Sequence, residues 1–212
     1  MTGTRADHKR ALCDEDMKKV FTRLPSSSAI PLAVRRAQDM FVLMFLLRGL
    51  PFVDLAYLRK SDLRDNVITY RRRKTGRPLS VTLTPEALEL LKKYMNRDSH
   101  SPYLFSLLKS GEGTKEAYRE YQLALRSFNQ QLTLLGEVLG LNDKLSSYTA
   151  RHTWATTAYY CEIHPGIISE AMGHSSIKVT ETYLKPFRNK KIDEANNQII
   201  DFVKHSIAGV VA

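Results

Sequence analysis

Apolar residues recur at intervals of three and four along most of this chain, a spacing that predicts amphipathic helices. Helices are expected at residues 14–24, 32–48, 52–58, 84–96, 115–135, 147–161, 165–172 and 176–184, and in a tail at 191–207. In the strongest of these, 32–48, the side chains expected to be buried are Met40, Phe41, Met44, Phe45 and Leu47. Along 115–135 the expected inward positions are Tyr118, Leu125, Phe128, Leu132 and Leu135.

Local signals place the ends of several of these helices. Gly49 is expected to end the helix at 32–48. Thr84 is expected to cap the helix at 84–96, with Pro85 at its first position, because the N–H that proline lacks would have no partner within the helix there. Ser147 or Thr149 is expected to cap the helix that runs through Cys161.

Two segments change from helical to strand character. Residues 66–73 and 79–83 flank Lys74-Thr75-Gly76-Arg77-Pro78, so they predict a hairpin with a basic tip. The predicted fold class is therefore α+β, mostly helical, with one small antiparallel β-sheet.

The chain is basic, so its candidate binding partners carry negative charge. It has 212 residues, enough for one large or two small domains with a real core. Its 32 Lys and Arg outnumber 22 Asp and Glu, giving a net charge of +10 and a pI near 9.6. Such a domain is a candidate for nucleic-acid binding, although a merely soluble basic protein has the same balance.

The sequence shows no sign of a disulfide-rich, membrane-spanning, secreted or metal-binding protein. Cys13 and Cys161 form no metal-binding or disulfide pattern, so we expect reduced thiols in an intracellular protein. The longest apolar run, 40–47, is far below the roughly 20 residues that span a bilayer, and the first ten residues hold no apolar signal core. No cluster of acids suits a metal, and we expect neither metal nor cofactor.

Four residues stand where elements end. Arg151 falls in the first turn of its helix, where free N–H groups and a guanidinium favour an anion. His174 follows Gly173 at a helix end, Tyr183 lies nine residues later, and Lys74 is at the hairpin tip. Each alone has an ordinary explanation: a solvated arginine, a locally bonded histidine, a core tyrosine, a turn lysine. Together they can converge on one ligand.

Their chemistry suits transfer of a phosphodiester. That reaction needs a nucleophile, an acid for the leaving oxygen and positive charge on the other phosphate oxygens. A tyrosine with a pKa near 10 must be deprotonated in place, and arginines must supply the charge that a metal otherwise would. The set therefore indicates a protein that breaks and rejoins DNA.

From about Lys9 to Val203 the chain resembles the catalytic domain of tyrosine recombinases, the phage integrase family. The family's second motif is present as Arg-His-Thr-Trp-Ala-Thr at 151–156, and its third as Gly173-His174 followed at fixed spacing by Tyr183. The hairpin lysine of the family matches Lys74. The resemblance implies the fold of DNA breaking-rejoining enzymes. It also implies that Tyr183 forms a 3′-phosphotyrosyl link, that Arg151 and His174 hold phosphate oxygens, and that Lys74 protonates the leaving 5′-oxygen.

One departure concerns the family's first catalytic arginine. Pro51 occupies its place in the string Gly-Leu-Pro-Phe-Val-Asp-Leu at 49–55. We expect Arg48, about one helical turn away, to reach the same phosphate. Arg35 and Arg36 are poorer candidates, since Arg36 lies roughly 18 Å farther along the helix axis. A displaced first arginine resembles integrases of conjugative transposons and DNA-inversion systems.

A second departure is Tyr148, where the family has His or Lys. Its phenol can donate a hydrogen bond to phosphate but is a weaker acid–base group near neutral pH. His152 follows Arg151 directly and so faces another side of the helix, which favours a structural role. Both remain candidates for contacting the phosphate or supporting residues that do.

The resemblance also predicts organisation and partners. We expect residues 1–10 to be loose, 11–187 to form the catalytic domain and 188–212 a tail helix, with the family's N-terminal core-binding domain absent. The expected partners are double-stranded DNA and further copies of the chain, as a tetramer on DNA. No membrane and no small-molecule substrate are expected, and the expected location is the bacterial cytoplasm.

Two alternative functions stay open. One is a DNA-binding protein without catalysis, in which Pro51 and Tyr148 mark a decayed site. The other is a type IB topoisomerase. The tail helix has two interpretations as well: its apolar stripe packs on its own domain, or it packs on a neighbouring protomer. The stripe comprises Ile192, Ala195, Ile199, Phe202 and Val203.

Overall fold

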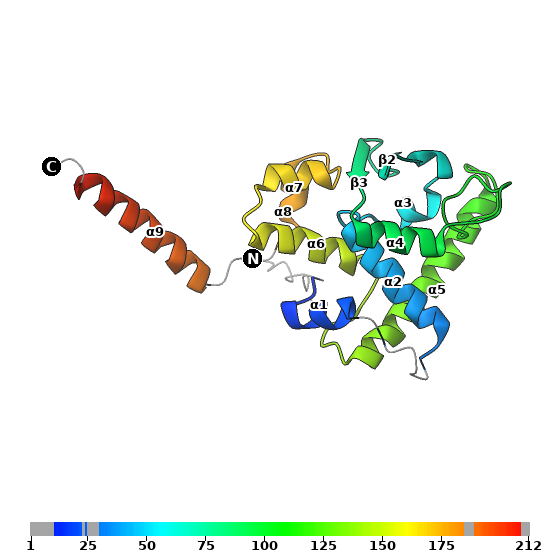
Figure 1. Ribbon diagram of the computed structural model, residues 1–212, viewed down its shortest axis with the longest axis horizontal. Coiled ribbons are helices and arrows are strands. Elements are labelled where there is room, and N and C mark those ends of the chain that lie inside the picture. The colour runs from blue at the N-terminus through cyan, green and yellow to red at the C-terminus, as the bar shows by residue number, and fades with distance from the viewer. Residues whose placement is uncertain (1–10, 23, 25–29, 185–188, 209–212) are drawn as a thin grey trace, which may run out of the picture.

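The computed structural model describes residues 11–22, 24, 30–184 and 189–208 (Figure 1). The expectation of a loose segment at 1–10 lies outside these residues. The elements are, in order, α1 (Asp14–Phe21), α2 (Leu32–Leu46), α3 (Phe52–Tyr57), the 3-10 turn η1 (Lys60–Asp62), β1 (Leu63–Arg64), β2 (Val67–Arg71), β3 (Pro78–Thr82), α4 (Pro85–Tyr94), α5 (Lys115–Leu139), α6 (Thr149–Tyr160), α7 (Pro165–Ala171), α8 (Ile177–Glu181) and α9 (Asn189–Ala208).

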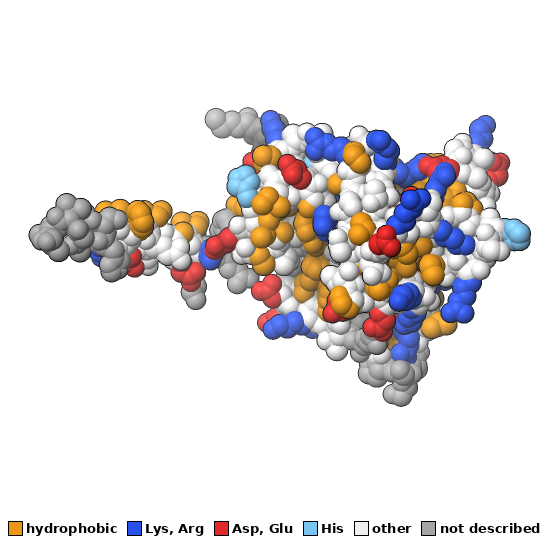
Figure 2. Space-filling view, turned by 45° about the horizontal axis from the view of Figure 1, so that its top comes forward, with side chains coloured by type: hydrophobic (Ala, Val, Ile, Leu, Met, Phe, Trp, Pro, Cys, Tyr) orange, Lys and Arg blue, Asp and Glu red, His pale blue; other side chains and the backbone are white. Residues whose placement is uncertain are grey.

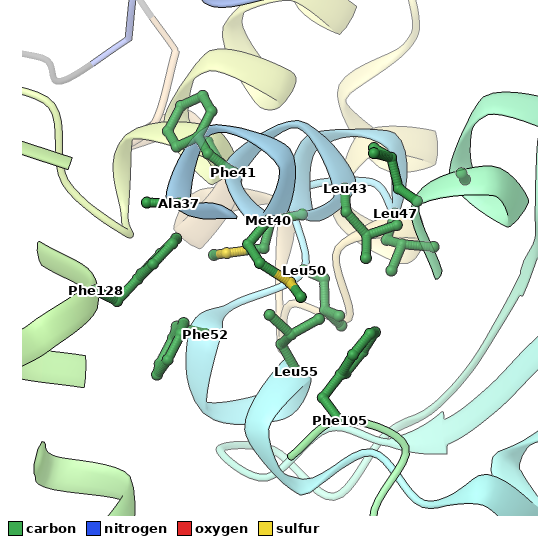
Figure 3. Close-up of a cluster of buried hydrophobic side chains, with 14 of the residues drawn as sticks. Ala37, Met40, Phe41, Leu43, Leu47, Leu50, Phe52, Leu55, Phe105 and Phe128 are labelled. Carbon is green, nitrogen blue, oxygen red and sulfur yellow. The ribbon is translucent and has the colours of Figure 1, made fainter. Parts of the chain in front are cut away.

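The main core forms around α2, which lies among α4, α5 and α6 (Figure 1). Figure 3 shows α2 side chains meeting residues of α3, α5 and the loop after α4, including Phe52 and Phe128, whose rings stack with centroids 4.7 Å apart. Burying a side chain of this size contributes roughly 1.5–3 kcal/mol. A second, smaller cluster joins α6, α7 and the segment after α8; its buried members are Ala155, Ile168, Met172, Tyr183 and Leu184.

The sheet is antiparallel with strand order β1-β2-β3, and Ile68 pairs with Val81 and Tyr70 with Leu79 across β2 and β3. The predicted hairpin is therefore confirmed, and so is the α+β, mostly helical class. The third strand, β1, was not predicted because two residues are too few to show alternation. Ile68, Tyr70 and Val81 are buried on one face, which turns the hairpin toward the core.

Four local predictions are wrong. Tyr118 is 59% exposed, because Ala117 takes the inward position and Tyr118 lies about 100° around the helix from it. The cap of α6 is neither Ser147 nor Thr149 but Tyr148, which makes no side-chain cap bond. The helix predicted at 176–184 spans only α8. The helix predicted to 48 ends at Leu46, since Arg48 and Gly49 have φ of 59° and 68°.

The tail forms α9, which extends away from the body in Figure 1. Figure 2 shows apolar side chains along one side of it; Ile192 is 55%, Ile199 64%, Phe202 73% and Val203 48% exposed. Lys191 forms an ion pair with Glu162 in the turn after α6. Among the described residues, no helix combines the length and apolar character that crossing a bilayer requires.

Candidate active site

Arg151 lies at the centre of the site, buried in the first turn of α6 with 2% exposure. Its Nη1 donates to the carbonyl of Gly49 at 2.9 Å, and its Nη2 donates to the carbonyl of Met172 at 2.7 Å. Gly49 must be glycine: its φ is positive, and a Cβ there would lie 2.9 Å from the Arg151 Cα. The guanidinium is thus fixed between the α2–α3 turn and the end of α7.

His174 orients this guanidinium. Its Nε2 lies 2.8 Å from Nη2 of Arg151, and its Nδ1 lies 2.8 Å from the hydroxyl of Thr180. Because arginine only donates, Nε2 accepts and Nδ1 carries the proton. Burial, followed by the positive charges of Arg151, Arg72 and Lys74, lowers the pKa of His174 to about 3. The imidazole is therefore neutral at physiological pH.

Tyr183 packs directly on these two residues and is 9% exposed. Its ring stacks on His174 with centroids 5.0 Å apart, and the Cζ of Arg151 lies 5.8 Å from the ring centroid. The hydroxyl of Thr156 in α6 donates to the Tyr183 carbonyl at 3.1 Å. The second core therefore places the predicted nucleophile against the predicted phosphate-binding pair.

Tyr148 and His152 also belong to this cluster. The ring of His152 lies 4.5 Å from that of Tyr183 and 5.7 Å from that of Tyr148. Burial raises the pKa of the Tyr148 phenol, and its interaction with Tyr183 raises it further. His152 is thus not directed away from the site, although it lies on a different side of α6 from Arg151.

The hairpin brings Lys74 to the same place. The Thr75 hydroxyl donates to the carbonyl of Gly173 at 3.2 Å. Gly173 has φ of 64°, and a Cβ there would lie 2.9 Å from Leu79 and 3.1 Å from Arg72, so the hairpin approaches the α7–α8 turn closely. Lys74 is exposed and, within the described residues, has no hydrogen bond or ion pair. Its ammonium is close enough to His174 to lower the histidine pKa.

Arg48 lies at the border of the site. Its backbone precedes Gly49, which contacts Arg151, but its guanidinium donates to the carbonyl of Ser80 on β3 at 3.2 Å. The side chain is half-buried and directed toward the hairpin. The structure thus brings Arg151, His174, Tyr183, Tyr148 and His152 together, with Lys74 and Arg48 at the rim.

Sequence reasoning missed Arg72, which is only 3% exposed. Its Nη1 donates to the carbonyls of Met172 and Gly173, both at 3.1 Å. Its Nε lies 3.8 Å from Oδ2 of Asp54, which is also buried. One signal was available: Arg72 has the strand parity of Ile68 and Tyr70, the buried positions of β2.

The site carries excess positive charge. Burial, then the neighbouring Arg72, lowers the pKa of Arg151. Burial raises the pKa of Asp54, and the guanidinium of Arg72 is among the charges that oppose this rise. Among the described residues, Asp54 is the only acid that forms an ion pair with either arginine. Two guanidiniums with one carboxylate favour an anionic ligand. No group of three or more metal-ligating side chains occurs in the described part of the chain.

Known proteins match most of this chain. The model of the phage integrase family matches residues 14–190. The tyrosine recombinase XerA of Pyrococcus furiosus is 26% identical over 180 residues, which cover 83% of this chain and 57% of that protein. A tyrosine recombinase of Pseudothermotoga lettingae is 27% identical over 184 residues, covering 82% and 59%. The chain thus spans less than two thirds of these relatives.

Solved structures share the fold. A Tn1549 transposon integrase in complex with transposon right end DNA has a TM-score of 0.64 at 14% identity, over 94% of this chain and 69% of that one. A crystal structure of XerA recombinase has a TM-score of 0.61 at 20% identity, over 89% and 64%.

Proposed function

Because the chain belongs to the phage integrase family, we propose that it is the catalytic domain of a site-specific recombinase that cleaves and rejoins double-stranded DNA through Tyr183. The observation that carries the proposal is the contact of Tyr183 with both Arg151 and His174 in one buried cluster. A nucleophile beside a fixed guanidinium is the arrangement that phosphoryl transfer requires.

The first step forms a bond between the Tyr183 oxygen and phosphorus and breaks the bond from phosphorus to the 5′-oxygen. The phenol proton passes to solvent, and Lys74 gives a proton to the leaving 5′-oxygen. The products are a 3′-phosphotyrosyl link and a free 5′-hydroxyl. In the second step the 5′-hydroxyl of a partner strand attacks the phosphorus and gives its proton to the neutral Lys74 amine, the bond from phosphorus to the Tyr183 oxygen breaks, and the released phenolate takes a proton from solvent. The bond energy is kept in the covalent intermediate, so the reaction uses no cofactor.

Arg151, His174 and Arg48 hold the non-bridging oxygens. Donation from Nε2 of His174 to phosphate requires the tautomer opposite to the one described above. Thr180 allows this exchange, since its hydroxyl can donate to Nδ1 as well as accept from it. Arg48 must release the Ser80 carbonyl, a solvent-exposed bond whose loss costs little.

The proposed assembly is a tetramer on DNA in the bacterial cytoplasm, with α9 docked on a neighbouring protomer. The exposed apolar stripe of α9 supports docking in trans over packing on its own body. The matching relatives named here are recombinases or integrases, which favours this function over a type IB topoisomerase.

Trapping on a nicked suicide DNA substrate tests the proposal. The wild-type chain should form a covalent protein–DNA product, and Tyr183→Phe, which lacks only the attacking oxygen, should form none while still folding and binding DNA. Tyr160→Phe, at the exposed end of α6, is the matched control and should retain the product. A covalent product from Tyr183→Phe would move the nucleophile to another residue, Tyr148 first. Its absence from the wild type would favour a DNA-binding protein without catalysis.

A further inference from the structure

We propose that Arg72 is a second buried guanidinium that binds the phosphate in this site, beside Arg151 and in addition to Arg48 at the rim. The inference rests on the proposed function and extends it to a residue outside the motifs matched above. It concerns a side chain that comes from the hairpin rather than from α6 or the α2–α3 turn.

Arg72 and Arg151 converge on one carbonyl. That of Met172 accepts from Nη1 of Arg72 at 3.1 Å and from Nη2 of Arg151 at 2.7 Å. The two guanidiniums come from elements far apart in the chain, and both are almost fully buried. Their shared acceptor places them side by side, and the Cζ of Arg151 lies 5.8 Å from the centroid of the Tyr183 ring.

Both guanidiniums keep donors for a ligand. Nε of Arg151 is buried without a hydrogen-bond partner, and Nε of Arg72 also has none, although it faces Oδ2 of Asp54 at 3.8 Å. Within the residues that the structure describes, Nη2 of Arg72 has none either. A buried N–H group without a partner costs about 1–3 kcal/mol, and two neighbouring positive charges repel each other. A phosphodiester bound between them would satisfy donors and charge at once.

Arg48 and Arg72 differ in their position relative to Arg151. Arg48 binds one backbone carbonyl on β3 and is half-exposed. Arg72 shares an acceptor with Arg151, and it stands two residues before Lys74, so one hairpin delivers a fixed charge and the proposed acid. A purely structural role is the competing explanation, because the same hydrogen bonds tie the hairpin to the α7–α8 turn.

The two roles separate when the charge of the phosphate is removed. Single-turnover cleavage is measured on suicide substrates that carry either a normal phosphate or a methylphosphonate at the cut position. The methylphosphonate lacks the negative charge, so it has less need of a guanidinium. Arg72→Gln should cut phosphate cleavage by ~10²–10³-fold, the scale of removing one preorganised donor. On the methylphosphonate substrate, the loss of cleavage caused by Arg72→Gln should be less than about tenfold. Arg71→Gln, which removes one charge from the outer face of the same hairpin, should show no such difference between substrates.

Equal losses on the two substrates would assign Arg72 a structural role and overturn the proposal. Cleavage of the phosphate substrate by Arg72→Gln at the rate of Arg71→Gln would also overturn it. Thermal unfolding checks each variant. If Arg72→Gln does not fold, Arg72→Lys carries the same comparison, with a smaller loss confined to the phosphate substrate. Wild-type protein without any covalent product would overturn the proposed function itself, and this inference with it, whereas a cleaving wild type with unaffected Arg72 variants would refute only the role of Arg72.

Discussion

Acidification should destabilise this fold through one buried histidine. His174 is 2% exposed, accepts a hydrogen bond from Arg151 and has a pKa lowered to about 3, against an ordinary value of 6.5. Protonation would place a third positive charge beside Arg151 and Arg72 and remove the acceptor that Arg151 uses. The unfolded chain accepts that proton freely.

The sign and size follow from linkage. Between pH 6.5 and 3 the unfolded state binds the proton and the folded state does not, so the contribution of His174 is present above pH 6.5 and is lost as the pH falls toward 3. With these two pKa values, lowering the pH from 7 to 5 removes about 2 kcal/mol of unfolding free energy. A domain of ordinary stability, about 5–15 kcal/mol, would remain folded for the measurement.

Urea unfolding at pH 7 and pH 5 provides the assay. Wild type should lose about 2 kcal/mol more than His174→Gln over this interval, because glutamine does not titrate. His100→Gln, in the exposed loop after α4, should keep the wild-type pH dependence. If wild type and His174→Gln lose stability equally, within about 0.5 kcal/mol, the folded state accommodates the protonated ring, and the argument for a neutral His174 is wrong.

Two further predictions concern catalysis. Arg48→Ala should lower cleavage of a suicide substrate by ~10²–10³-fold, whereas Arg36→Ala should not; equal, mild losses from both would make Arg48 an ordinary helix-end residue. A substrate with a 5′-bridging sulfur should restore cleavage to Lys74→Ala, because a thiolate leaves without a proton, and should not restore it to Arg151→Ala. Failure to restore the Lys74 variant would transfer the acid role to His174 or Tyr148.

The part of the site that could be read from the sequence is the part that is local in the chain. Arg151 lies in α6, His174 in the turn between α7 and α8, and Tyr183 just after α8, and these segments fold against one another through a small core of their own. A linear motif therefore captures their geometry. The hairpin was also predictable, since alternation and the turn residues at its tip are local signals.

Long-range contacts decided the rest. Arg72 donates to carbonyls 100 and 101 residues away. The spacing of apolar residues along the chain cannot predict a contact between segments so far apart. The direction of the Arg48 side chain depends on a strand 32 residues farther along. Tyr118 was misplaced for a related reason: adjacent helix positions differ by about 100°, and packing, rather than composition, selected Ala117.

The tail helix offers the sharpest test of assembly. On α9, Phe202 is 73% and Ile199 64% exposed, so a charge at 202 should change the unfolding free energy of the isolated chain by no more than about 0.5 kcal/mol. Docking on a neighbouring protomer would bury the Phe202 ring, which contributes roughly 1.5–3 kcal/mol for each copy. Aspartate at this position removes that contribution. Phe202→Asp should therefore unfold like the wild type but fail to form higher complexes on DNA in sedimentation experiments. Asn197→Asp adds the same charge away from the apolar stripe and should assemble normally. A loss of several kcal/mol in the isolated Phe202→Asp chain would instead mean that α9 packs on its own body in solution, because only a buried position resists a charge so strongly.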